Sequence, residues 1–298
     1  MPQKLTISII GAGRVGQTLG RLWRDRGYTI ESVVCRTKQS ARRAVAFIGG
    51  GNPHSIDTSD LPASKVFLVS VPDDEIAETA KQIAILRADW SRTVFLHTSG
   101  SLSSRILEPL SDCKAHTGSA HPLLSISSPK LGVSQIAGGY FCIEGDKEAT
   151  SLAKRLVKSI GGKTFEIDSS DKALYHAAAV LASPHLTALL SLSIQALEQC
   201  GVSKTEAHKI LQPLVNSTIE NLWKHGAETA LTGPVSRADI ATIRRNLRAL
   251  AQTSELAENV YRFLSLQGAN LSRSAGAPQE KLEPIIHELL QNPWRQSR

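Results

Sequence analysis

Paired cysteines are missing from this sequence. Its four cysteines (Cys35, Cys113, Cys142 and Cys200) are scattered over 298 residues, and no two of them form a CxxC pair. The histidines show no metal-ligand spacing either. These absences argue against a disulfide framework, structural zinc or any other bound metal, and they favour a reducing cytoplasm.

Motifs for several other chemistries are also absent. The chain has no GxSxG nucleophile elbow and no Walker loop. Its formal charge of +7 would attract nucleic acid, but no basic patch interleaved with aromatic residues accompanies it. The charge therefore favours small anionic ligands, such as a phosphorylated cofactor and a carboxylate substrate, over nucleic acid. A solvated basic surface is the alternative interpretation.

Long uninterrupted apolar runs are lacking too. The N-terminal apolar run is short and leads straight into a glycine-rich loop, so we do not expect a signal peptide. Residues 177–197 carry no Asp, Glu, Lys or Arg, but several polar residues and a proline interrupt them. This composition predicts a buried helix or a dimer interface, and no membrane partner.

The most informative stretch that is present is LTISIIGAGRVG, residues 5–16. An apolar, strand-like run breaks into Gly11-x-Gly13-x-x-Gly16, and a helix-compatible segment follows. Gly11 allows a tight turn, Gly13 lets a pyrophosphate approach the backbone, and Gly16 lets the helix pack closely on the strand. The context predicts a dinucleotide site in which Ala12, Arg14 and Val15 complete the loop.

The end of the second predicted strand indicates which dinucleotide is bound. Residues 28–35 are rich in β-formers and are followed by Arg36, Thr37 and Lys38. An acidic residue here would bind the ribose 2′-hydroxyl of NAD, whereas a basic one accommodates the 2′-phosphate of NADP. Glu31 lies too early in the strand to serve. We therefore expect NADP, with NADPH preferred over NADH; an exposed basic turn is the alternative.

Strands alternate with helices up to about residue 168, after which strand-like runs vanish. This alternation predicts an α/β fold, an N-terminal Rossmann domain with a doubly wound, mainly parallel sheet. Residues 118–122 are interpreted as turn-like. The expected domains are a dinucleotide-binding domain over 1–168 and an all-helical substrate and dimerisation domain over 169–298. Predicted helices of the second domain are 170–200, 203–225, 236–251, 254–266 and 279–291.

Several motifs together resemble a family of NADP oxidoreductases that join a Rossmann-like domain to an uncharacterised helical C-terminal domain. They are IIGAGRVG (9–16), VSVPDDEI (69–76), HTSGSLSS (97–104), AHPL (120–123), KALYHAAAV (172–180) and LTGPVSRAD (231–239). The family is similar to pyrroline-5-carboxylate reductases, 6-phosphogluconate and 3-hydroxyacid dehydrogenases, and ketopantoate reductases. The resemblance implies hydride transfer, a helical domain of the 6-phosphogluconate dehydrogenase C-terminal-like type, and a homodimer formed through that domain. It also suggests ketopantoate as a substrate.

Ligands of such sheets bind at the carboxyl ends of the strands. This rule places Val71, Pro72 and Thr98 beside the cofactor, and Ser99 and Gly100 beside a substrate carboxylate or the nicotinamide amide. His97 is expected to point into the sheet. His121 closes a loop at the expected edge of the sheet and is a candidate donor to the substrate, although a histidine before proline is often only a turn residue.

A ketone that accepts hydride becomes an alkoxide, so a proton donor should face its oxygen. Lys172 opens the long helix after the domain junction, and His176 follows one turn later on the same face. Related dehydrogenases carry Lys and Asn at this spacing, so His176 stands in place of the usual Asn. We expect Lys172, His176 and His121 to be catalytic; a surface lysine and a capped histidine are the alternative.

Two further residues are expected to contact the substrate. Ser183 precedes Pro184, which should bend or break its helix, at a place where pyrroline-5-carboxylate reductases carry a Ser-Gly-Pro element. Arg237 lies in a stretch where Ser236-x-x-Asp239 resembles a helix-capping box. With Arg244 and Arg248 it would share one helical face, and its planar fork would suit a carboxylate.

The sequence thus predicts hydride transfer between NADPH and a small carbonyl compound bearing a carboxylate, with ketopantoate, a 2-keto acid, as the leading substrate. Reduction of a cyclic imine acid is the alternative within enzymology. A non-catalytic NADP-binding sensor or scaffold is the alternative from another class, because a nucleotide-binding fold does not itself imply a reaction.

Overall fold

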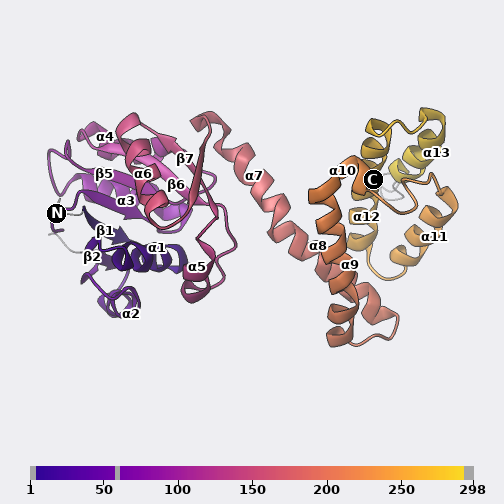
Figure 1. Ribbon diagram of the computed structural model, residues 1–298, viewed down its shortest axis with the longest axis horizontal. Helices are drawn as coiled ribbons and strands as arrows, with labels where there is room; N and C mark the ends of the chain where they lie inside the picture. The colour runs from indigo at the N-terminus through magenta and orange to yellow at the C-terminus, as the bar shows by residue number, and fades with distance from the viewer. Residues whose placement is uncertain (1–4, 58–60, 292–298) are drawn as a thin grey trace, which may run out of the picture. The chain divides into compact units, whose positions relative to one another are not determined.

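The fold was analysed in a computed structural model that describes residues 5–57 and 61–291. The chain divides into two compact units, residues 1–183 and 184–298 (Figure 1). The division falls after the helix that begins at Lys172, one helix later than the expected boundary at 168. The reason is that the first turn of this helix packs on the sheet of the first unit, as described below.

The first unit is built on an eight-stranded sheet with the order β3-β2-β1-β4-β5-β6-β7-β8. All neighbouring strands are parallel except β6 and β7, which are antiparallel. This arrangement confirms the predicted doubly wound, mainly parallel sheet. The strands are β1 (Thr6–Ile10), β2 (Thr29–Cys35), β3 (Asn52–Ser55), β4 (Val66–Val69), β5 (Val94–His97), β6 (His116–Pro122), β7 (Tyr140–Gly145) and β8 (Lys163–Glu166).

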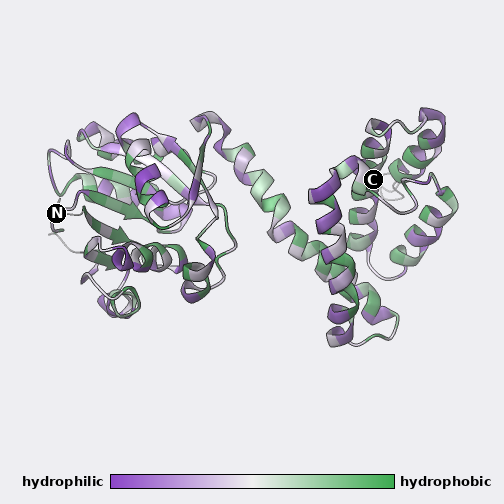
Figure 2. Cartoon of the chain, in the orientation of Figure 1, coloured by the Kyte–Doolittle hydropathy of each residue, from purple (hydrophilic) through white to green (hydrophobic). Residues whose placement is uncertain are grey.

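Two apolar cores cover the faces of this sheet, because alternate residues of each strand point to opposite sides. Ile7, Ile9 and Leu68 pack with helices α1 (Arg14–Asp25), α2 (Lys38–Ile48) and α6 (Lys147–Ser159). Phe67 and Val69 pack on the other face with α3 (Asp73–Ala84) and α4 (Glu108–Asp112). The central strands are accordingly hydrophobic throughout (Figure 2), as expected for a sheet buried on both faces.

Three parts of this unit differ from the sequence prediction. Residues 118–122 are not a turn but the interior of β6, because this segment pairs with β5 on one side and β7 on the other. Gly118 is needed there, since a Cβ on it would lie 3.0 Å from the Glu144 carbonyl oxygen of the neighbouring strand. The short edge strand β3 and helix α5 (Pro129–Gln135) were not predicted.

Helix α7 (Lys172–Ala182) leads from the first unit into the second. Helix α8 (Pro184–Gln199) follows, and the break at Ser183 confirms the predicted effect of Pro184. The described part of the second unit is helical as predicted, and Ile243, Leu247 and Ile285 belong to its buried apolar cluster. Its other helices are α9 (Lys204–His225), α10 (Ala227–Ala230), α11 (Ile240–Ala251), α12 (Glu255–Ser274) and α13 (Gln279–Leu290).

The capping box predicted at Ser236 is wrong. Helix α11 begins at Ile240, and its N-cap is Asp239, whose side chain accepts a hydrogen bond from the Thr242 amide. The Ser236 hydroxyl instead donates to the Gly233 carbonyl. Arg237 therefore precedes the helix and does not share its face with Arg244, which pairs with Glu288 of α13.

Residues 177–197 are not a buried helix in the single chain. Within the described residues, the helical stretch Ser169–Gln199 has the length and composition of a membrane span. Its most apolar segment of 18 residues has a mean hydropathy of 1.6, and none of that segment is buried. One helix of this kind is weak evidence for a membrane. The alternative prediction for the same residues, a dimer interface, stays a prediction.

Candidate active site

A pocket of about 250 Å³ lies at the carboxyl ends of β1, β2 and β4. Gly11, the residue after β1, has a φ of +85°, and a Cβ on it would lie 2.6 Å from the backbone of Ser70 and Val71. Only glycine fits this turn. The pocket lies between β1 and β4, where the strand order reverses, which is where open α/β sheets bind their ligands.

Gly13 meets the requirements of a phosphate site. It is the N-cap of α1, and a Cβ built on it has no atom within 4 Å. The first turn of α1 carries no acidic residue. The free N–H groups of a helix start attract anions, so this open position beside Ala12, Arg14 and Val15 suits a pyrophosphate. Gly16 is required for packing, since its Cβ would lie 2.5 Å from the Gly11 carbonyl oxygen.

The three residues after β2 have different local roles. The exposed Arg36 lines the pocket and donates to Glu75 of α3, with 2.5 Å between Nη2 and Oε1. Thr37 caps α2 by accepting a hydrogen bond from the Ser40 amide, and Lys38 is the first residue of that helix. Arg36 is therefore the residue of this trio that the structure places in the pocket wall.

Residues at the ends of β4 and β5 continue from this pocket along the sheet edge. Val71 and Pro72 line the pocket, and the Thr98 hydroxyl donates to that of Ser70 at 3.1 Å. The Ser99 side chain is buried and donates to a carboxylate oxygen of Asp73 at 2.7 Å. The hydroxyl of Ser99 is therefore committed to Asp73.

Lys172, the first residue of α7, is the charged side chain that reaches deepest into the first unit. It is 1% exposed, and its ammonium donates to the Ser99 carbonyl and the Ser119 hydroxyl, both at 3.0 Å. Burial lowers the pKa of Lys172. The lysine thereby ties the start of α7 to the loop after β5 and to β6, which explains why α7 belongs to the first unit.

Two histidines converge on Gly100, next to the Lys172 contact. A Cβ on Gly100 would lie 2.5 Å from His176 Cδ2 and 2.9 Å from His121 Nε2. The two imidazole centroids are 5.9 Å apart. The structure thus brings together Lys172, His176, His121 and Gly100, which are distant in the sequence and were predicted to share a site.

Burial and positive charge keep His121 neutral. Burial and the nearby Lys172 ammonium lower the pKa of His121 to about 4. The same two causes lower the pKa of His97 to about 4, and His97 is fully buried in the sheet as predicted. His121 is therefore an uncharged hydrogen-bonding group at neutral pH.

The carboxylate of Glu144 is buried close to this cluster. Burial alone would raise the pKa of Glu144, but hydrogen bonds from Ser169, Ser104 and Ser119 outweigh burial and hold it below its usual value. The Ser104 amide donates to Glu144 at 2.7 Å. Ser119 also accepts from Lys172, so it connects the ammonium to the carboxylate.

Sequence reasoning missed several members of the site: Tyr175, Glu144, Asp73 and Glu75. Tyr175 is hydrogen-bonded to His121, with 2.7 Å between its hydroxyl and Nδ1. Its position three residues after Lys172, on the helical face shared with His176, was the signal that could have identified it. Glu144 gave no such signal, because its partners come from distant segments.

Ser183 and Arg237 are not among these contacts. Ser183 is exposed at the break between α7 and α8, and Arg237 is exposed in the second unit. Their assignment to the substrate stays a prediction.

One group of possible metal ligands occurs among the described residues, His116, Asp146 and Glu148. The two Asp146 carboxylate oxygens already accept hydrogen bonds from the amides of Thr117 and Ala149. Asp146 thus serves as the cap of α6, and we assign no metal to it.

Two family models match the chain, and the second of them begins within the first structural unit. The model of a Rossmann-like domain matches residues 1–122, and that of a domain of unknown function, DUF2520, matches residues 139–268. The chain combines a Rossmann-like domain with a DUF2520 domain. His121 and Gly100 come from the Rossmann-like match, whereas Lys172, Tyr175 and His176 come from the DUF2520 match. Among curated proteins, no sequence matches this chain.

Solved structures share the fold over most of the chain. The "putative NADP oxidoreductase BF3122" from Bacteroides fragilis is 23% identical, with a TM-score of 0.73 over 90% of this chain and 99% of its own. Protein TM1727 from Thermotoga maritima is 26% identical, with a TM-score of 0.71 over 90% and 99%. A reductive aminase from Aspergillus terreus, in complex with NADPH and ethyl levulinate, is 18% identical, with a TM-score of 0.59 over 99% and 95%.

Proposed function

We propose that this protein is an NADPH-dependent reductase that transfers hydride to a small carbonyl compound bearing a carboxylate. The observation that carries the proposal is that the glycine-lined pocket and the two histidines lie along the same edge of the sheet, at the carboxyl ends of neighbouring strands. The pocket suits a dinucleotide, the Thr98–Ser70 hydrogen bond links it to the next strand, and Gly100 brings His121 and His176 to the following one. A nicotinamide cofactor supplies the hydride when bound.

The basic wall of the pocket supports NADPH over NADH. Arg36 lines the pocket at the end of β2, where a 2′-phosphate is recognised in this fold. The Bacteroides fragilis and Aspergillus terreus structures carry NADP or NADPH in their descriptions.

The neutral imidazole of His121 suits hydrogen bonding to the oxygen that gains charge during reduction. His121 and His176 flank Gly100, and we propose that the substrate carbonyl binds beside these two imidazoles. The side chain of Lys172 donates to two acceptors close to the histidines, so we propose that it supports the site and does not contact the substrate oxygen. A 2-keto acid such as ketopantoate is the leading substrate.

Reduction of a cyclic imine acid is the second candidate. The ammonium of Lys172 is 1% exposed and already donates two hydrogen bonds, which limits direct proton donation to a ketone. An imine arrives already protonated and needs less acid catalysis. Reductive amination is also the named activity of the Aspergillus terreus relative.

The deciding experiment follows NADPH absorbance with a panel of 2-keto acids, including ketopantoate, and of cyclic imine acids. The panel is run with the natural protein, His121→Gln and Lys172→Met. We expect keto-acid turnover that falls by about 100-fold in His121→Gln, because losing one hydrogen-bond donor to a developing oxyanion costs about 10²–10³ in kcat. Turnover of imines alone, little changed in His121→Gln, would favour the second candidate. Tight NADPH binding without any turnover would indicate a non-catalytic sensor.

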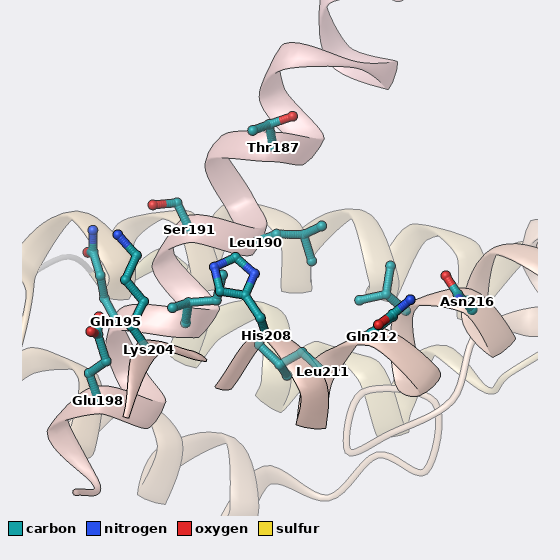
Figure 3. Close-up of a pocket in the computed structure, with 12 residues that line it drawn as sticks. Thr187, Leu190, Ser191, Gln195, Glu198, Lys204, His208, Leu211, Gln212 and Asn216 are labelled. Carbon is teal, nitrogen blue, oxygen red and sulfur yellow. The ribbon is translucent and has the colours of Figure 1, made fainter. Parts of the chain in front are cut away.

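The proposed partner of the helical unit is a second copy of the chain. A groove of about 630 Å³ between α8 and α9 is lined by polar side chains together with the apolar ones of Leu190, Ile194, Leu211 and Val215. Figure 3 shows Leu190 and Leu211 among them. Glu198 and Lys204 lie at one end of the groove, offering charges of both signs to a symmetric partner. Trp223, near the end of α9, is a further exposed apolar residue of this helix.

Light scattering of the purified protein tests this arrangement. We expect a dimer for the natural protein and a monomer for Leu190→Asp, whereas Thr205→Asp, outside the groove lining, should remain dimeric. A monomeric natural protein would contradict it.

The unpaired cysteines are consistent with the proposed cytoplasmic location.

A further inference from the structure

Among the residues that the structure describes, Tyr175 is hydrogen-bonded to the ring of His121. Its hydroxyl lies 2.7 Å from Nδ1, and the two rings meet edge to face, with centroids 5.7 Å apart. The tyrosine comes from α7 and the histidine from β6, so the bond joins the first turns of the helix to the sheet. The sequence analysis gave Tyr175 no role.

The phenol is held in place on its other sides. Its ring packs against Phe165 of β8, with centroids 5.8 Å apart, and its hydroxyl also hydrogen-bonds with the Cys142 thiol. Cys142 lies directly opposite His121 in the antiparallel pair of β6 and β7. Tyr175 therefore sits between two facing residues of neighbouring strands.

The direction of the hydrogen bond follows from the relative basicity of the groups. Burial raises the pKa of the Tyr175 phenol and of the Cys142 thiol and lowers that of His121, so all three are uncharged near neutral pH. The imidazole nitrogen is a better hydrogen-bond acceptor than a thiol sulfur, which is weak in both directions. The phenol therefore donates to Nδ1 and accepts from Cys142.

This direction fixes the position of the imidazole proton. A neutral imidazole whose Nδ1 accepts a hydrogen bond carries its proton on Nε2. Nε2 is the nitrogen that faces Gly100, since a Cβ there would lie 2.9 Å from it. The proton is thus presented where the substrate oxygen is proposed to bind.

We propose that Tyr175 is a positioning residue that holds His121 in its Nε2–H tautomer and aims that proton at the position beside Gly100. The inference rests on the proposed reductase function for its effect on turnover. The tautomer itself is a property of the protein without substrate and can be tested separately.

Other groups face His121 and contribute to its pH dependence. They are Lys172 and His176 of α7, His97 of β5 and Asp73 of α3. The lysine and the two histidines lower the pKa of His121, whereas Asp73 raises it. None of them is changed by removing the Tyr175 hydroxyl, so the comparison below isolates the phenol.

The test compares Tyr175→Phe with Tyr140→Phe. Tyr140 belongs to the same aromatic cluster, packing on Phe165 with centroids 6.3 Å apart, and is 48% exposed. Long-range ¹H–¹⁵N NMR spectra of each protein, labelled at histidine and without substrate, report which nitrogen of His121 carries the proton. We expect Nε2–H in the natural protein and in Tyr140→Phe, and a mixture of tautomers in Tyr175→Phe. A proton on Nδ1 in the natural protein would overturn the proposal.

Turnover supplies the second measurement. We expect kcat of Tyr175→Phe to fall roughly 3- to 10-fold, the equivalent of one hydrogen bond, with the Kd of NADPH unchanged. On the acid side of its pH profile, kcat should begin to fall at a higher pH, because Nδ1 becomes free to accept a proton. Cys142→Ala should keep the Nε2–H tautomer, which tests the assigned direction in a protein with its tyrosine intact. Correct tautomers without any turnover would count against the reductase function and leave the positioning role of Tyr175 supported.

Discussion

Arg36 and Glu75 form an ion pair at the rim of the dinucleotide pocket. The guanidinium Nη2 lies 2.5 Å from the carboxylate Oε1, and both residues line the pocket. Arg36 is 78% exposed, so the pair contributes little to stability. Its relevance is to binding, because a 2′-phosphate and Glu75 would compete for the same guanidinium.

Substitutions of Arg36 and of Glu75 should change the Kd of NADPH in opposite directions. Arg36→Gln should raise the Kd of NADPH by about 10-fold or more, since hydrogen bonds to a charged group are worth about 1.5–3 kcal/mol. Glu75→Gln should lower it by releasing the arginine. The Kd of NADH should change little in both. Fluorescence titration with each cofactor gives these values, and an equal loss of NADH and NADPH binding in Arg36→Gln would refute the 2′-phosphate contact.

Two glycines of the same loop should respond differently to alanine. Gly13→Ala should fold normally, because its Cβ points into open space, but should bind NADPH at least about 10-fold more weakly by obstructing the pyrophosphate. Gly11→Ala should lose roughly 2 kcal/mol or more of stability, since its positive φ and its contact with the Ser70 backbone both oppose a Cβ. Urea unfolding and NADPH titration separate the two effects. Normal NADPH binding by Gly13→Ala would argue against a phosphate at this loop.

The sequence predicted the sheet well where the residues of a strand form an apolar run that can be recognised without its neighbours. The apolar runs of β1, β4 and β5 are buried on both faces and could be read directly, as could the glycine turn after β1. Residues His116–Pro122 of β6 contain glycine, serine, two histidines and proline, which is a turn-like composition. Their strand conformation depends on two neighbouring strands, and that information lies far away in the chain.

The site shows the same limit. Lys172 and His176 were predicted because one helical turn relates them, and the structure places both beside Gly100. Burial was not predictable: the local sequence gives no sign that Lys172 is 1% exposed and bonded to Ser119. Glu144 lies opposite Ser119 in the β6–β7 pair, a relationship that only the strand register creates.

The space beside Gly100 should be essential for turnover. Gly100→Ala would place a methyl group 2.5 Å from His176 Cδ2, so the imidazoles must move and the substrate position is filled. We expect kcat/KM to fall by about 10-fold or more, since catalytic groups must keep their geometry closely, with NADPH binding preserved. Gly50→Ala is the matched control, because its Cβ would meet neighbours at 3.8 Å or more. Unchanged kinetics of Gly100→Ala would show that the substrate binds elsewhere.

Acid should destabilise the protein through its buried histidines. His97 and His121 have an ordinary pKa of 6.5 when unfolded and a pKa of about 4 when folded. Between these values the unfolded chain binds more protons, so stability is complete above pH 6.5 and is lost as the pH falls toward 4. Each histidine contributes at most about 3 kcal/mol.

Urea unfolding midpoints measured from pH 7 to pH 4.5 test this expectation. The carboxylates with lowered pKa, including Glu144 and Asp239, have ordinary values of 4.5 or below, so they contribute mainly at lower pH. His97→Gln and His121→Gln should each show a shallower loss of stability with acid, even where their absolute stability differs. His225→Gln, at the exposed end of α9, should follow the natural protein. If the slope of His97→Gln equals that of the natural protein, the buried neutral imidazole is not what makes the fold acid-sensitive.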